Sequence, residues 1–181
     1  MPPLWERDCA FFIKNKPTYA EGIGNLFSPI ELSLSGYQIM IVKPNVFVST
    51  REAFSNIHPH RPEYPVKEAI LRPVAEWKDI LINDFEASVF PQHPVIGEIK
   101  EELYHQGAIY ASMSGSGSSV FGLFAPGFVL PEIDWGTDVF LLQRYIKQIN
   151  LTNNYVLTIF SKSQHGSGVY IEYPAKQASY F

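Results

Sequence analysis

Ala108–Phe124 reads AIYASMSGSGSSVFGLF, a run of serines and glycines between two apolar segments. The flanking residues, Ala108–Met113 and Val120–Phe124, are of the types found in short buried strands, so Ser114–Ser119 connects two strands of one core rather than two domains. Glycines in such a loop permit positive φ angles, and its successive N–H groups and hydroxyls can surround an anion such as a phosphate. A plain structural turn is the alternative. A Walker A loop is excluded because no lysine follows the glycines, and the glycine spacing around Ser116 does not fit a nucleophile elbow.

The residues before this loop predict a helix and a strand with clear ends. Pro94 occupies a favoured first position of a helix, and apolar residues then recur at helical spacing until Gly107. Tyr37–Lys43 is apolar and β-rich between a glycine and a proline, which predicts a buried strand.

Shorter elements are expected between these two. Arg51–Asn56 predicts a short helix with Ser49 or Thr50 as its cap. Ile57–Pro65 contains three prolines and two histidines and predicts a loop, while Val66–Trp77 can form helical turns around its proline.

The residues after Phe124 predict a further helix and further strands. Val139–Ile149 reads as an amphipathic helix and Tyr155–Phe160 as a strand, and the polar tail from Ser161 is expected to be irregular apart from a strand at Val169–Tyr173. Helices interspersed with strands indicate an α+β or α/β sandwich.

Composition narrows the class of protein. The 181 residues are 46% hydrophobic with a net charge of -4, which allows a packed core and supplies no basic field for nucleic acid. A single cysteine, Cys9, cannot form an internal disulfide, so we expect a reducing, cytoplasmic location. The longest apolar stretch, Val120–Leu130, is far shorter than the roughly 20 residues of a membrane span. We therefore expect neither nucleic acid nor membrane as a partner.

Asp8 is the first candidate for chemistry outside the loop. It directly precedes the apolar segment Cys9–Ile13, where a carboxylate could accept a proton from a substrate hydroxyl. Capping a helix or pairing with Arg7 is the structural alternative. Considered without any other residue, Asp8 favours this structural role over the catalytic one.

The remaining candidates have ordinary structural explanations beside the functional ones. Phe54 could present its ring to a base or belong to the core. His58 and His60 lack the further ligands of a metal set, so no metal site is predicted. His93 and His105 are expected at the two ends of the helix that begins at Pro94. Asn83–Glu86 offers two carboxylates, for which a solvated or capping role is expected.

Taken in order, these segments resemble the GHMP small-molecule kinases, and among them the kinases of non-mevalonate isoprenoid synthesis. The resemblance covers Asp8 to Phe124. It is carried by DCAFFI at 8–13, YAEGIG at 19–24, IVKP at 41–44, VST at 48–50 with Phe54, NDFE at 83–86 and MSGSGSSVF at 113–121.

The resemblance implies phosphorylation of the 2-hydroxyl of a cytidine-diphosphate-linked methylerythritol, with ATP and Mg²⁺ as cofactors and this small molecule as substrate. Asp8 matches the catalytic aspartate that takes the hydroxyl proton, and Thr50 and Phe54 match positions that hold the cytidine. The phosphate-binding loop of the family matches Ser114, Gly115, Ser116, Gly117 and Ser118.

The resemblance also implies the fold and the domains. Residues 35–160 are expected to form the GHMP kinase C-terminal domain, a ferredoxin-like α+β sandwich of helices on an antiparallel sheet. Residues 1–34 would be a remnant of the preceding domain and residues 161–181 an irregular tail. The family's ATP-binding glycine-rich loop and catalytic lysine have no match here, and Asn25 stands where an acid is usual. We therefore expect the carboxy-terminal portion of such a kinase, a gene fragment that is inactive alone.

Two other functions stay open. The chain could act in another GHMP kinase, on mevalonate-type or sugar substrates, in which case no base would stack on Phe54. It could also be a non-catalytic α+β module that associates with itself through the surface that a lost domain would leave bare.

Overall fold

A computed structural model describes seven stretches of the chain, and these form two antiparallel sheets with short helices. The described residues are 17–21, 26–57, 64–130, 132–136, 139–146, 156–161 and 167–172. The helices are α2 (Thr50–Ser55), α3 (Val66–Ala69), the 3₁₀ turn η1 (Val74–Glu76), α4 (Trp77–Ile80), α5 (Phe85–Val89) and α6 (Pro94–His105). The strands are β1 (Thr18–Glu21), β2 (Leu26–Pro29), β3 (Gln38–Pro44), β4 (Tyr110–Met113), β5 (Val120–Phe124), β6 (Val139–Tyr145), β7 (Val156–Ser161) and β8 (Ser167–Glu172).

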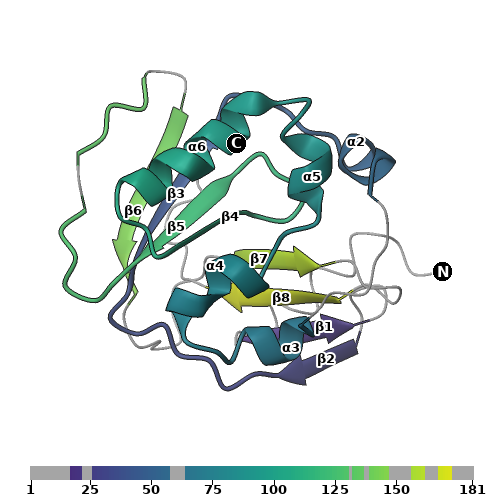
Figure 1. Cartoon of the computed structure of the whole chain (residues 1–181), viewed down its shortest axis with the longest axis vertical. Coiled ribbons are helices and arrows are strands. Elements are labelled where there is room, and N and C mark those ends of the chain that lie inside the picture. The colour runs from purple at the N-terminus through teal and green to yellow at the C-terminus, as the bar shows by residue number, and fades with distance from the viewer. Residues whose placement is uncertain are drawn as a thin grey trace, which may run out of the picture.

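The first sheet has the strand order β4-β5-β3-β6, and every neighbouring pair in it is antiparallel. Helix α6 lies across this sheet, with α5 and α2 beside it (Figure 1). Mixed helices and antiparallel strands confirm the predicted α+β class.

The two faces of this sheet bury different sets of side chains because neighbouring residues of a strand point in opposite directions. Met40 and Val42 of β3 pack in the cluster that includes Ile96, Ile99 and Leu103 of α6. The other face packs in a second cluster, in which Ile39, Phe121 and Leu123 lie with residues of α3, α4 and β1. The sheet is therefore covered on both faces, which explains why Tyr37–Lys43 reads as a continuous apolar run.

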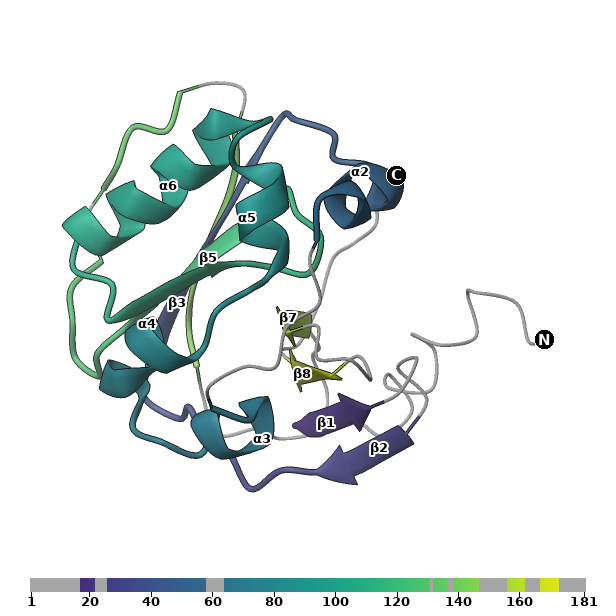
Figure 2. The ribbon, with the colours of Figure 1, turned by 45° about the vertical axis from the view of Figure 1, so that its right-hand side comes forward.

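The second sheet has the order β2-β1-β8-β7, again with antiparallel neighbours. It lies below the first sheet in Figure 1, and Figure 2 shows α3 beside β1. The strand expected at Val169–Tyr173 is β8, so residues 161–181 are not irregular throughout, and Tyr173 lies outside the described residues. The proposed division at residues 34 and 160 stays a prediction.

The predicted helix after Pro94 is α6, with Pro94 at its first turn and His93 and His105 at its ends. The helical turns expected around Pro73 are α3, η1 and α4, and the short helix after Ser49 is α2. Ser49 rather than Thr50 is the cap, because its side chain accepts a hydrogen bond from the Glu52 N–H at 3.2 Å. Within the described residues, no helix is long and apolar enough to cross a membrane.

The helix predicted over Val139–Ile149 is wrong. Val139–Tyr145 is the edge strand β6, paired along its whole length with β3, and residues 147–149 lie outside the described part. Its Val, Phe and Tyr residues favour strands, and pairing satisfies the backbone of β3 on the side away from β5. A tertiary contact therefore decides between two structures that the local pattern allows.

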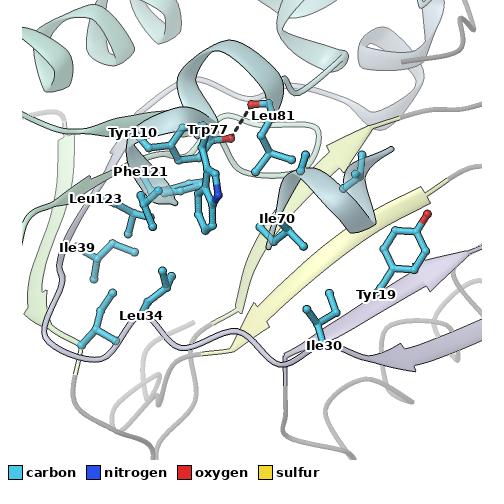
Figure 3. Packing of buried hydrophobic residues seen from close by; sticks show 14 residues of the cluster. Tyr19, Ile30, Leu34, Ile39, Ile70, Trp77, Leu81, Tyr110, Phe121 and Leu123 are labelled. Carbon is cyan, nitrogen blue, oxygen red and sulfur yellow. Dashed lines mark hydrogen bonds between the residues drawn. The ribbon is translucent and has the colours of Figure 1, made fainter. Parts of the chain in front are cut away.

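Trp77 and Tyr110 connect the helical layer to the sheet (Figure 3). Their rings meet edge to face with centroids 5.4 Å apart, and the Trp77 indole N–H donates to the Arg72 carbonyl at 2.9 Å. The Tyr110 hydroxyl donates to the Leu81 carbonyl at 3.0 Å, so both polar tips are satisfied inside the core.

Replacing Tyr110 by phenylalanine should lower the free energy of unfolding by about 1 to 2 kcal/mol at neutral pH, because the buried Leu81 carbonyl loses its donor while the ring remains. Urea denaturation measures this. Tyr64→Phe, at an exposed position, is the matched control and should change stability by less than about 0.5 kcal/mol. Equal stability of the Tyr110→Phe variant and the parent chain would contradict the assignment.

The difference in free energy of unfolding between the Tyr110→Phe variant and the parent chain should shrink at alkaline pH. Burial raises the pKa of Tyr110 well above its ordinary value of about 10, so the folded chain holds this proton more tightly than the unfolded chain does. The stability contributed by the hydroxyl is present below pH about 10 and is lost as the pH rises further. The deficit of Tyr110→Phe should shrink by about 1.4 kcal/mol per pH unit in that range. Parallel stability curves up to pH about 11 would argue against it.

Candidate functional site

The loop Ser114–Ser119, between β4 and β5, is a tight turn closed by two backbone hydrogen bonds. The Ser114 N–H donates to the Ser119 carbonyl at 2.8 Å, and the Gly117 N–H donates to the Ser114 carbonyl at 3.0 Å. Gly115 and Gly117 have φ angles of 55° and 90°, a region that favours glycine. At Gly115 an added Cβ would meet nothing within 4 Å, so this side of the loop is open to a ligand.

Three N–H groups of this loop are free to bind an anion. Within the described part of the chain, the backbone N–H groups of Gly115, Ser116 and Ser118 donate no hydrogen bond. Successive unpaired N–H groups around positive-φ glycines form the concave nests that hold phosphates in other proteins. The geometry therefore favours the anion-binding interpretation of this loop over a plain turn.

Asn83 holds the loop in place. Its side-chain amide donates to the Met113 carbonyl at 2.6 Å and to the Gly115 carbonyl at 2.9 Å, and its Oδ1 accepts from the Phe85 N–H at 3.0 Å. The residue is buried. One side chain thus joins the end of β4 and the first part of the turn to the start of α5.

Glu86 approaches the same loop from α5. Its Oε1 accepts from the Met113 N–H at 2.8 Å and from the Ser112 hydroxyl at 3.2 Å, and its Oε2 lies 2.5 Å from Lys100 Nζ. The expectation of a solvated or capping role is wrong for Glu86, because its side chain is only 8% exposed. A carboxylate is buried here because one cation and two donors compensate its charge.

Phe54 and Thr50 lie on α2, which packs against α5. The Phe54 ring is 40% exposed and meets the ring of Phe85 edge to face, with centroids 4.9 Å apart. Because Asn83 binds both the loop and the Phe85 N–H, a continuous series of contacts runs from the loop to Phe54. Thr50 is exposed at the first turn of the same helix.

Asn83, Lys100 and the pair formed by Glu52 and His93 are features that sequence reasoning missed. His93 Nε2 lies 2.8 Å from Glu52 Oε1 and joins the start of α6 to α2. Both residues of that pair are partly buried. The signal for Asn83 was its place directly before a helix, where a side-chain oxygen can accept from a free N–H group.

Asp8 lies outside the described residues, as do His58 and His60. Its position relative to the loop is therefore untested, and its catalytic role stays a prediction. Among the residues that the structure does describe, no group of three His, Cys, Asp or Glu side chains assembles into a metal site.

The family model for the C-terminal region of GHMP kinases, "GHMP kinases C terminal", matches residues 66–129. This range contains Asn83, Glu86, Lys100 and the loop. A solved structure of 4-(cytidine 5'-diphospho)-2C-methyl-D-erythritol kinase matches with a TM-score of 0.55 and 25% identity over 64% of this chain and 43% of that one.

Three relatives named 4-diphosphocytidyl-2-C-methyl-D-erythritol kinase illustrate the range of similarity. Those of Bacteroides thetaiotaomicron and Bacteroides fragilis are 79% and 69% identical over 74% and 71% of this chain. That of Cytophaga hutchinsonii is 46% identical over 65% of it. The aligned parts are 48%, 47% and 44% of the relatives, so the chain spans about half the length of the curated relatives it matches.

The matched segment contains the apolar strands β4 and β5 and the turn between them. It also contains Asn83 and Glu86, which hold this turn. Residues 66–129 of the chain therefore match the C-terminal region of the GHMP kinases, and the similar proteins aligned over about three quarters of the chain carry the name of a kinase.

Proposed function

We propose that this chain supplies the C-terminal half of an ATP-dependent kinase for 4-diphosphocytidyl-2-C-methyl-D-erythritol, in the synthesis of isoprenoid precursors. The observation that carries the proposal is the free set of N–H groups at Gly115, Ser116 and Ser118, held by Asn83, in a chain 79% identical to a relative with that name. We propose the cytoplasm as its compartment, in keeping with the single cysteine.

In this proposal the loop holds polyphosphate. Backbone N–H groups neutralise the charge of phosphate oxygens without adding a proton-bearing side chain, and their positions are set before the ligand arrives. Phosphoryl transfer has a loose transition state and asks mainly for positioning and charge stabilisation. A loop whose first residues are held by one buried amide meets that need.

Transfer would proceed from ATP to the 2-hydroxyl of the substrate. The hydroxyl oxygen forms a bond to the γ-phosphorus, the bond from that phosphorus to the bridging oxygen breaks, and ADP leaves. The proposed role of Asp8 is to accept the hydroxyl proton. Asp8 is assigned by resemblance alone.

The cytidine end is assigned to α2. Phe54 exposes part of its ring while Phe85 supports the ring from the side, so a base can stack on it without reorganising the core. The exposed hydroxyl of Thr50, one helical turn earlier, can hydrogen-bond to the base or ribose. Phosphates at the loop and a base at α2 are the two ends of a nucleotide-linked substrate.

Mg²⁺ is proposed as a cofactor because the family uses it with ATP. Among the described side chains no set of ligands assembles for it, so no step of this proposal is assigned to a bound metal ion. The expected association of the chain with itself also stays a prediction.

Asn83→Ala should weaken binding of inorganic pyrophosphate about tenfold or more, because the carbonyls of Met113 and Gly115 lose their shared donor and the loop loses its shape. Calorimetry measures the affinity, and amide chemical shifts of residues 115–118 locate the ligand. Asn45→Ala, an exposed asparagine, is the control and should bind like the parent chain. Unchanged affinity in Asn83→Ala would reject the loop as the binding element.

Phe54→Leu should weaken binding of CDP about tenfold and leave pyrophosphate binding unchanged, since stacking on an aromatic ring contributes about 1 to 3 kcal/mol per base. Phe140→Leu, on the exposed edge strand β6, is the control. Equal binding of CDP by Phe54→Leu and the parent chain would favour another GHMP kinase, whose substrate carries no base.

The isolated chain should show no turnover of ATP with 4-diphosphocytidyl-2-C-methyl-D-erythritol. Charge stabilisation in such kinases needs a nucleotide loop, Mg²⁺ and a cation together, and the motifs of that loop and of the catalytic lysine have no match in this sequence. A coupled assay of ADP release tests this. Substrate-dependent ATP consumption that Asp8→Ala abolishes would overturn the expectation.

A further inference from the structure

Glu86 uses both carboxylate oxygens at a point directly beside the phosphate loop. One oxygen accepts from the N–H of Met113, the last residue of β4, and from the Ser112 hydroxyl, while the other pairs with Lys100. The side chains of Glu86 and Lys100 are 8% and 19% exposed, so solvent screens this pair weakly. The pair is therefore part of the electrostatic environment of the loop.

Hydrogen bonding alone does not require a charge at this position. A glutamine could accept the Met113 N–H and the Ser112 hydroxyl through its side-chain oxygen, without the cost of burying a carboxylate. A carboxylate beside an anion site would also repel the anion unless a cation cancels it. Lys100 lies 2.5 Å from Glu86 and supplies that cation.

Two tyrosines near Glu86 do not carry a charge that could compensate it. The pKa values of Tyr104 on α6 and Tyr110 on β4 are raised above the ordinary value. Burial is the main cause for each, and the charge of Glu86 adds to the rise. Both tyrosines are therefore neutral at neutral pH. Lys100 is also held from a second side, since its Nζ lies 5.9 Å from the centroid of the Phe90 ring.

We propose that Glu86 is a positioning residue for the phosphate loop and that Lys100 sets the local charge so that the loop accepts polyphosphate. Glu86 fixes the end of β4 through the Met113 N–H, from which the turn begins. Lys100 cancels the carboxylate that performs this task. This inference rests on the proposed function, which places phosphates at residues 114–118.

The test compares Glu86→Gln with Lys100→Met in binding of inorganic pyrophosphate. Glu86→Gln keeps an acceptor for Met113 and removes a negative charge, so its affinity should rise about threefold. Lys100→Met leaves the carboxylate uncompensated, so its affinity should fall about tenfold. Both changes disturb a buried pair and should lower the melting temperature. A merely structural role would move both affinities in one direction, so opposite directions identify the electrostatic role.

A measurement without ligand tests the positioning role by itself. In Glu86→Ala, amide hydrogen exchange at Met113 and Ser114 should become at least about tenfold faster, whereas Glu86→Gln should retain most of the protection. Glu98→Gln, an exposed glutamate on the same helix as Lys100, is the control for both experiments and should change neither.

The outcomes separate this inference from the proposed function. If the parent chain binds pyrophosphate but the two variants change affinity in the same direction, or not at all, the electrostatic role of Lys100 is wrong. If Glu86→Ala leaves exchange at Met113 unchanged, the positioning role is wrong. Absence of pyrophosphate binding in the parent chain would reject the proposed function and the charge-setting role, while the exchange experiment would still decide the positioning role.

Discussion

The candidate site depends on a single buried amide, the side chain of Asn83, which binds the last carbonyl of β4, one carbonyl of the turn and the first N–H of α5. A turn of small residues has many conformations, and ordering it has an entropic cost that its own two backbone hydrogen bonds offset only in part. Asn83 lies outside the turn and restrains it by two further hydrogen bonds. The same contact positions Phe85 and, through its ring, Phe54, so the two ends of the proposed ligand site share one anchor.

The sheet beneath the turn explains why this anchor is rigid. Strands β5 and β3 are paired on both sides and covered on both faces, so neither can shift register without moving apolar side chains out of a core. The turn leaves the sheet between β4 and β5, and β4 is contacted by Asn83, which precedes α5, and by Glu86 of α5. These contacts restrict motion at the base of the loop, and such motion would displace the N–H donors.

The sequence predicted most of the local elements and the character of the loop, but not the contacts that hold it. The spacing of apolar residues, together with a proline or glycine at an end, was sufficient to predict β3, α6 and the β4–β5 pair. They failed for β6, whose residues suit a helix and a strand alike until the free edge of β3 selects the strand. The role of Glu86 was also missed, since burial of a carboxylate depends on Lys100, fourteen residues away.

The charge distribution around the turn supports the proposed anion-binding role. A structural turn needs its carbonyls and N–H groups paired, and here the carbonyls of Met113 and Gly115 are paired while three N–H groups face no protein acceptor among the described residues. That asymmetry leaves partial positive charge on one side of the loop. The pairing of Glu86 with Lys100 keeps this carboxylate, which binds the end of β4, from opposing that charge. A loop that holds an anion, as proposed here, would use both arrangements: the unpaired N–H groups as donors and the Lys100 charge to cancel that of Glu86.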